Sequence, residues 1–133
     1  MHLTLTTCSA EKRRDAGLLP AALRYRHPRI ALAREHALQT GQPLVILSGR
    51  YGLLSSWTPI AWYDHALRMQ EVDRLIPRVA AFLTVRGVTE VDAFLSPPEA
   101  PGWAPYHALL NAATLRAQVA VTPFMPCPPI RRA

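Results

Sequence analysis

The chain is poor in cysteine and has a single lysine. Cys8 and Cys127 stand in 133 residues without a metal-ligating partner at close spacing, which excludes a disulfide framework and indicates no metal site. No apolar run reaches the length of a membrane span, and no basic segment precedes a long apolar one near Met1. We therefore expect a cytoplasmic protein without a membrane partner, with Cys8 as a reduced thiol, and without a metal or other cofactor.

Acidic residues are also scarce, with 9 Asp and Glu against 15 Lys and Arg, and Lys12 is the only lysine. Six cations fall between positions 12 and 29, namely Lys12, Arg13, Arg14, Arg24, Arg26 and Arg29. Such clustering favours an anionic partner, nucleic acid above all. A basic helix face that is simply solvated would give the same pattern, and so would a codon pool biased toward arginine.

Strand-like and helix-like segments alternate along the chain. Short apolar runs predict strands over 3–7, 43–47, 88–95 and 118–123, and apolar residues at helical spacing predict helices over 20–39, 66–86 and 103–115. The alternation predicts an α/β fold, a three-layer α/β/α sandwich with a four-stranded, mostly parallel sheet. We expect one domain over 1–125 and an irregular proline-rich tail over 126–133.

Two details of this prediction concern proline, glycine and tryptophan. Pro28 is expected to break or kink the first helical segment, and Gly41 to close it. Residues 53–63 are rich in Ser, Trp and Pro without periodicity and are predicted to form a loop, with Trp57 covering the core beneath it.

The ends of the predicted strands carry the chemically unusual residues. The first strand is followed by Cys8-Ser9-Ala10-Glu11-Lys12-Arg13, the second by Ser48-Gly49-Arg50-Tyr51-Gly52 and the third by Ser96. Carboxyl ends of parallel strands meet at one edge of a sheet, where ligands bind in such folds. Small residues at 48 and 49 allow a ligand close to the backbone, while Arg50 offers a forked cation and Tyr51 a stacking face. The alternative for 49–52 is a plain surface turn.

The candidate roles follow from residue chemistry. Asp64 is the candidate catalytic carboxylate for N-glycosidic cleavage, because a carboxylate can orient water or stabilise an oxocarbenium-like state; its alternative role is to cap the following helix. Lys12 is expected to hold a phosphate, with Schiff-base chemistry as the alternative. Cys8 is expected to be a small buried residue rather than a nucleophile. Tyr51, Tyr63, Trp57 and Trp62 are candidates to stack on a base; the alternative for the two tryptophans, favoured for Trp57, is to cover the core.

Three motifs occur in order: Thr6-Thr7-Cys8-Ser9-Ala10-Glu11-Lys12, Ser48-Gly49-Arg50-Tyr51-Gly52-Leu53-Leu54 and Tyr63-Asp64-His65-Ala66-Leu67. Together they resemble the YaaA-like family of small bacterial and phage domains, which carry Cys-Ser-x-x-Lys and Leu-Ser-Ala-Lys-Tyr-Gly-Leu-Leu signatures and a Tyr-Asp pair. Here Gly49 and Arg50 replace the Ala-Lys pair, and after residue 83 only Ser96, Tyr106 and Pro123 still fit. The resemblance implies a fold akin to uracil-DNA glycosylases and an association with DNA, modified nucleobases and stress responses.

Residues and resemblance together lead to an expected function. We expect a DNA glycosylase-like enzyme that hydrolyses the N-glycosidic bond of a modified or damaged base. Asp64 would be its catalytic residue, and substrate would be bound by Cys8, Ser9, Lys12, Arg13, Ser48, Gly49, Arg50, Tyr51, Gly52, Tyr63, Ser96 and Tyr106. The alternatives are a DNA- or nucleotide-binding module without catalysis and a small enzyme on free nucleotides.

Overall fold

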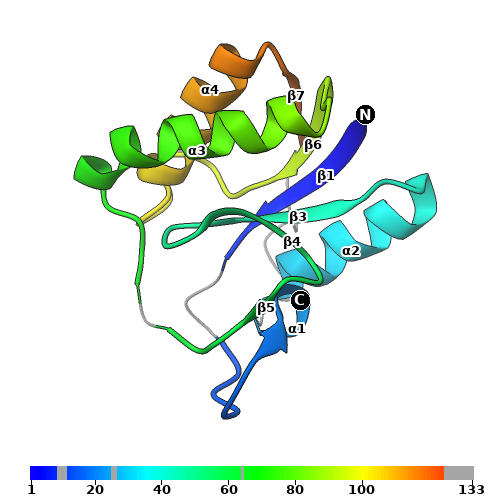
Figure 1. The fold of residues 1–133 in the computed structure, drawn as a ribbon, viewed down its shortest axis with the longest axis vertical. Coiled ribbons are helices and arrows are strands. Elements are labelled where there is room, and N and C mark those ends of the chain that lie inside the picture. Colours follow the sequence, from blue (N-terminus) through cyan, green and yellow to red (C-terminus); the bar gives the residue numbers. More distant parts are fainter. Residues whose placement is uncertain (9–11, 25–26, 64, 125–133) are drawn as a thin grey trace, which may run out of the picture.

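The computed structural model describes residues 1–8, 12–24, 27–63 and 65–124. Its centre is a five-stranded sheet in the order β4-β3-β1-β6-β7 (Figure 1). β1 pairs in parallel with β3 and β6, β6 pairs in parallel with β7, and only the edge strand β4 is antiparallel. The strands are β1 (His2–Thr7), β3 (Leu44–Ser48), β4 (Gly52–Ser55), β6 (Glu90–Phe94) and β7 (Ala120–Phe124).

The predicted α/β class and mostly parallel sheet are confirmed, but the prediction of four strands is wrong. The additional strand, β4, lies in the segment predicted as a loop, where buried Leu53 and Leu54 pair with β3. Two apolar residues between a turn and a Ser-Trp-Thr-Pro stretch are too short a run to show strand periodicity. A second ribbon pairs β2 (Leu19–Pro20) with β5 (Pro59–Ile60). Trp57 is 74% exposed, so the prediction that it covers the core is also wrong.

The first predicted helix is two elements, α1 (Ala21–Arg24) and α2 (Pro28–Thr40). Pro28 occupies the first turn of α2, where its missing N–H costs nothing. Gly41 ends α2 in the left-handed conformation, with φ of 69°. Because an L side chain is strained at that angle, the predicted break at Pro28 and the predicted stop at Gly41 both have a local physical cause.

The next helix begins later than predicted. It starts as a 3-10 turn, η1 (Met69–Glu71), and continues as α3 (Val72–Val85), with Pro77 inside it. Residues 66–68 are not helical; instead Leu67 packs against Gly49 and donates its N–H to the Tyr106 hydroxyl. The last helix is α4 (Ala104–Ala117), and Gln118, with φ of 58°, ends it before β7.

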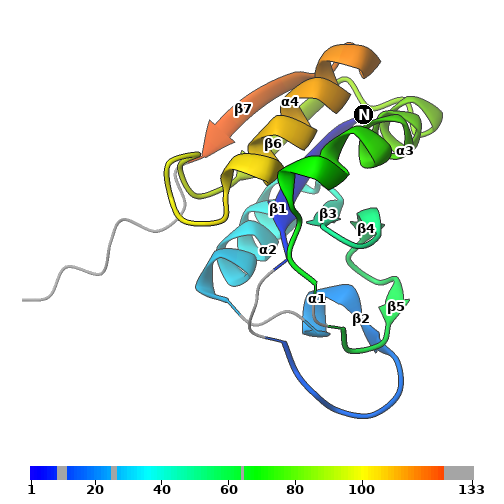
Figure 2. The ribbon, with the colours of Figure 1, turned by 90° about the vertical axis from the view of Figure 1, so that its left-hand side faces the viewer.

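Helices cover both faces of the sheet (Figures 1 and 2). Leu3 and Leu5 of β1 join the main core with side chains of α3 and α4, whereas Ala33 and Ala37 of α2 pack with Phe94 and Leu44 on the opposite face. In β6, Ala93 joins the main core and Phe94 the opposite cluster, which is the period-two pattern of a strand buried on both faces. Within the described ranges, no helix has the length and apolar character needed to cross a membrane.

The strand order reverses at β1. The chain leaves β1 through α2 to reach β3 on one side, and later places β6 on the other side of β1. In open sheets of this kind, the carboxyl ends of the strands at such a reversal border a crevice where ligands bind. The fold therefore directs attention to the residues immediately after β1 and β6. The predicted tail over 126–133 lies outside the described residues.

Candidate functional site

A cavity of about 300 Å³ opens at the carboxyl ends of β1 and β6. Its walls come from five parts of the chain: the end of β1, Lys12, the start of α2, residues 65 and 66, and the connection from β6 into α4. The lining residues are Thr7, Cys8, Lys12, His27, Arg29, His65, Ala66, Ser96, Pro101, Gly102, Trp103 and Tyr106. The ends of the first and third predicted strands, with Cys8 and Ser96, border this cavity, whereas residues 48–52 after the second strand, predicted to share the cleft, do not line it.

The lining combines cations with aromatic rings. Lys12 and Arg29 supply formal positive charge, and Trp103 and Tyr106 supply rings. None of the described lining residues is an aspartate or a glutamate. A cavity with this lining favours a ligand that has both an anionic group and a flat, unsaturated ring.

Arg29 is the best anchored of these cations. It is 3% exposed, and its Nη1 donates to the Thr6 hydroxyl at 2.9 Å and to the Thr7 carbonyl at 2.8 Å. The guanidinium also lies over the Trp103 ring, 4.8 Å from its centre. Because the hydrogen bonds fix the fork against β1 and the ring packs on it, Arg29 provides a preorganised positive charge at the end of the strand.

Tyr106 ties three segments together at the cavity wall. Its hydroxyl accepts the Leu67 N–H at 3.2 Å and lies 3.4 Å from the Cys8 sulfur. Both Cys8 and Tyr106 are buried. Cys8 is thus a small side chain packed at the end of β1, as predicted, and Tyr106 has a structural role beside its place in the lining.

The Ser48–Gly52 motif is the turn of the hairpin between β3 and β4. Ser48 is fully buried, and its hydroxyl accepts the N–H groups of Arg50 and Tyr51, each at 3.2 Å. Gly52 closes the turn with φ of 79°, an angle that favours glycine. The backbone of this motif is therefore a turn, which was the alternative interpretation of residues 49–52 from the sequence.

The sequence predicts that Gly49 lets a ligand approach the backbone, but protein occupies that space. A Cβ built on Gly49 would lie 2.7 Å from the Leu67 nitrogen, a separation at which the backbone would have to shift. Glycine at this position therefore accommodates the segment over 65–67, and neither Gly49 nor Ser48 lines the cavity.

A cationic and aromatic cluster connects this hairpin with the cavity. Tyr63 is 3% exposed and its hydroxyl is 2.8 Å from the Ser48 hydroxyl. The Lys12 amine lies 4.7 Å from the centre of the Tyr63 ring, and the Arg50 guanidinium lies 5.7 Å from it. Tyr51 meets the same ring edge-on. The first two predicted strand ends thus meet at one edge of the sheet, with Lys12 shared between this cluster and the cavity.

The six-cation cluster of the sequence is not one exposed surface. Arg24 is fully buried and Arg29 nearly so. Arg13 pairs with Asp15 at 2.7 Å, and Arg14 stacks over Trp62 at 5.2 Å. Fewer positive charges are therefore available to a nucleic acid than the clustering in the sequence suggests. The sequence does not show which cations are buried or paired with other residues of the protein.

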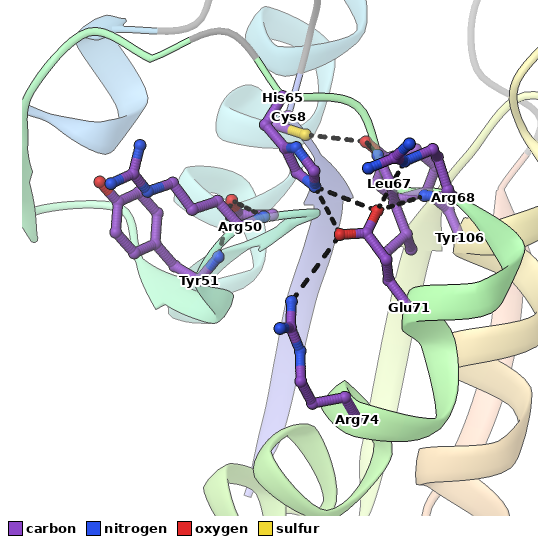
Figure 3. A network of polar contacts seen from close by, with 10 residues as sticks. Cys8, Arg50, Tyr51, His65, Leu67, Arg68, Glu71, Arg74 and Tyr106 are labelled. Carbon is purple, nitrogen blue, oxygen red and sulfur yellow. Dashed lines mark hydrogen bonds and ion pairs between the residues drawn. The ribbon is translucent and has the colours of Figure 1, made fainter.

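His65 and Glu71 form a pair that the sequence did not predict (Figure 3). The His65 Nε2 lies 2.9 and 3.1 Å from the two carboxylate oxygens of Glu71. Desolvation raises the pKa of Glu71, but the Arg68 N–H and His65 outweigh it and hold that pKa below its usual range. His65 and Glu71 are six residues apart and lie on either side of a helix start, a spacing that helical periodicity does not bring together, so no pattern pointed to this pair.

The predicted binding residues fall into three groups. Cys8, Lys12, Ser96 and Tyr106 line the cavity, and the second group, Ser48, Gly49, Arg50, Tyr51, Gly52 and Tyr63, belongs to the hairpin and its cluster. Arg13 lies in neither and faces solvent in its pair with Asp15. Ser9 and the predicted catalytic Asp64 lie outside the described residues.

The lining also contains residues that were not predicted as binding residues: His27, Arg29, His65 and Trp103. A signal was available for His27 and Arg29, since they flank Pro28 at a helix start, and helices that follow parallel strands begin near the ligand edge of the sheet. Within the part of the chain that the structure describes, no group of three or more His, Cys, Asp and Glu side chains is placed to hold a metal ion.

Comparison with known proteins gives no further guide. No family model, no curated protein and no solved structure matches this chain.

Proposed function

We propose that this protein binds one nucleotide unit in the cavity and hydrolyses the N-glycosidic bond of a modified or damaged base in DNA. The observation that carries the proposal is the lining itself, in which Lys12 and buried Arg29 stand beside the rings of Trp103 and Tyr106. The cations suit a phosphate and the rings suit a nucleobase.

The size of the cavity supports a single nucleotide rather than a duplex. About 300 Å³ is at the lower end of small-molecule sites. Enzymes that act on a base in DNA extrude the nucleotide from the stack into such a pocket or take it from a single strand. In this proposal the phosphate lies toward Lys12 and Arg29, and the base lies toward Trp103.

The motif resemblance supplies the reaction class. A three-layer sandwich of the uracil-DNA glycosylase type is part of the proposal, and the mostly parallel sheet with helices on both faces is compatible with it. Asp64 precedes His65, a lining residue, and is proposed as the carboxylate that stabilises the oxocarbenium-like state. An association with a stress response that repairs DNA in the cytoplasm belongs to the same proposal.

A binding module without catalysis is the second candidate. It is favoured by one observation, that the described lining residues include no carboxylate. On this view the cavity holds a base and phosphate and performs no reaction on them.

The two candidates separate in one experiment with Asp64→Asn. Oligonucleotides that carry a panel of modified bases are incubated with the protein, and released base, abasic sites and affinity are measured. For an enzyme, Asp64→Asn should reduce base release by a factor of roughly 10² or more while binding stays within a few-fold. Lys12→Ala should instead weaken binding. Binding without base release by the unaltered protein would select the module, and unaltered release by Asp64→Asn would remove that residue from the mechanism.

A further inference from the structure

The imidazole ring of His65 lines the cavity, and the Glu71 carboxylate contacts one of its ring nitrogens. The ring is among the lining residues, and its side chain is 30% exposed. Both carboxylate oxygens of Glu71 lie within hydrogen-bond distance of one ring nitrogen, Nε2 (Figure 3). The orientation of the ring is therefore set by a charged partner.

Glu71 is itself fixed. Its carboxylate accepts the Arg68 N–H at 3.0 Å, the Arg68 side chain approaches at 3.5 Å and the Arg74 guanidinium at 3.7 Å. The Glu71 side chain is only 14% exposed. A carboxylate with this set of donors stays ionised near neutral pH and serves as an acceptor only.

The hydrogen bond determines where the proton of a neutral His65 ring lies. An ionised carboxylate cannot donate, so Nε2 must carry the hydrogen and Nδ1 becomes the ring's acceptor. A carboxylate that fixes the tautomer and orientation of an imidazole is the arrangement by which histidine serves as a general base.

The other lining histidine contacts the backbone through its other ring nitrogen. The His27 Nδ1 accepts the Arg29 N–H at 3.1 Å, so its Nε2 is the protonated nitrogen of a neutral ring. His107 donates from Nε2 to the Ser96 carbonyl at 2.6 Å and does not line the cavity. His65 is thus a lining histidine whose Nε2 lies on the carboxylate of Glu71.

We propose that His65 is the acid–base residue of the cavity and that Glu71 is its positioning residue, an inference that rests on the proposed hydrolysis. In the step, a water oxygen bonds to C1′ of the sugar while the bond from C1′ to the base nitrogen breaks. The electron pair of that bond leaves with the base. His65 Nδ1 takes one proton of the water, and the imidazolium then gives that proton to the departing base. The net change is the addition of one water molecule.

The first test reads the ring directly and needs no turnover. Long-range ¹H–¹⁵N spectra of the neutral ring should show His65 as the Nε2–H tautomer, and addition of a 2′-deoxynucleoside 5′-monophosphate should shift its Nδ1 resonance. Glu71→Gln should give a mixture of tautomers, because an amide can donate as well as accept. The matched control Glu99→Gln, which removes one exposed charge with no described partner, should leave the spectrum unchanged.

The second test is the pH profile of base release. His65→Gln should lower kcat by a factor of roughly 10² to 10⁴ and remove the acid limb of the profile, with KM within a few-fold. Glu71→Gln should lower kcat less and move that limb. The control His2→Gln, at the opposite end of β1, should keep the unaltered profile.

The two proposals fail in different ways. Absence of base release by the unaltered protein would refute the proposed hydrolysis. Three results would each overturn the role of His65. They are a Nδ1–H tautomer of its neutral ring, a Nδ1 resonance that does not shift when the nucleotide is added, and a folded His65→Gln variant with normal kcat.

Discussion

Arg24 is a fully buried cation, and the described contacts place backbone carbonyls around its fork. Its Nη1 donates to the carbonyls of Arg13 and Asp15 at 2.6 and 3.0 Å, and its Nη2 donates to those of Gly17 and Ile60 at 2.8 and 3.1 Å. One side chain thus fixes the segment that follows Lys12 against β5. The course of the chain beside the cavity depends on this guanidinium.

Replacement of that guanidinium should be costly. Arg24→Leu is expected to lower the free energy of unfolding by roughly 3 kcal/mol, since one buried and three part-buried carbonyls lose their donors together. Urea unfolding followed by circular dichroism measures the change. Arg116→Leu, which removes an exposed arginine, should change the same quantity by less than about 0.5 kcal/mol. A loss below about 1 kcal/mol for Arg24→Leu would show that solvent satisfies these carbonyls.

At the scale of the elements, a second network joins a helix to two strands at the end of the sheet away from the cavity. Asp92 of β6 is 6% exposed, with one oxygen 2.7 Å from the His2 Nε2 of β1 and the other 2.8 Å from the His36 Nε2 of α2. Burial raises the pKa of Asp92, but the hydrogen bonds of His36 and His2 outweigh it and hold that pKa below 3.8.

The lowered pKa has a defined consequence for stability. The ionised carboxylate is favoured by folding, so its contribution is fully present above the unfolded value of 3.8 and is lost as pH falls through the lower folded value. Asp92→Asn should therefore flatten the dependence of the urea midpoint on pH as the pH falls below about 4.5. Glu99→Gln is the control. Equal acid sensitivity of both variants would show that Asp92 does not govern it.

The elements also show which features could be predicted. The buried run over 43–47 and the stop at Gly41 carry their own local signals, and both are found in the structure. β4 could not be predicted, because its pairing with β3 depends on the tight turn over 49–51 rather than on its own two leucines. The predicted start of the helix at residue 66 was wrong for a similar reason. Contacts with Gly49 and Tyr106 hold Leu67 in a non-helical segment.

At the scale of the whole molecule, net charge and usable charge differ. The chain has a formal charge of +6, yet Arg24 and Arg29 are inside the protein and Arg13 is paired. The cavity site could be foreseen in part, because strand ends converge by topology alone. The burial of the arginines could not, because it depends on partners that lie far away in the sequence.

This distribution of charge predicts a modest salt dependence of DNA binding. Few phosphates can be contacted at one nucleotide-sized cavity, so we expect a slope of roughly −2 to −3 for log affinity against log salt on single-stranded DNA. Arg14→Glu should reduce the magnitude of that slope by about 1, whereas Arg116→Glu should leave it unchanged. Fluorescence anisotropy over a salt series measures both. An affinity that does not change with salt would refute the nucleic-acid interpretation.

The shared position of Lys12 makes the protein easy to label selectively. Lys12 is the only lysine of the chain, and its amine lies over Tyr63 at the cavity. The α-amino group donates to the Gly87 carbonyl at the other end of the sheet. An amine-directed fluorophore or crosslinker that reacts with lysine can therefore reach one side chain of this sequence, and that side chain lies at the cavity. A ligand bound in the cavity should protect the lysine from reaction, so the extent of labelling at Lys12 would report cavity occupancy without any engineered cysteine.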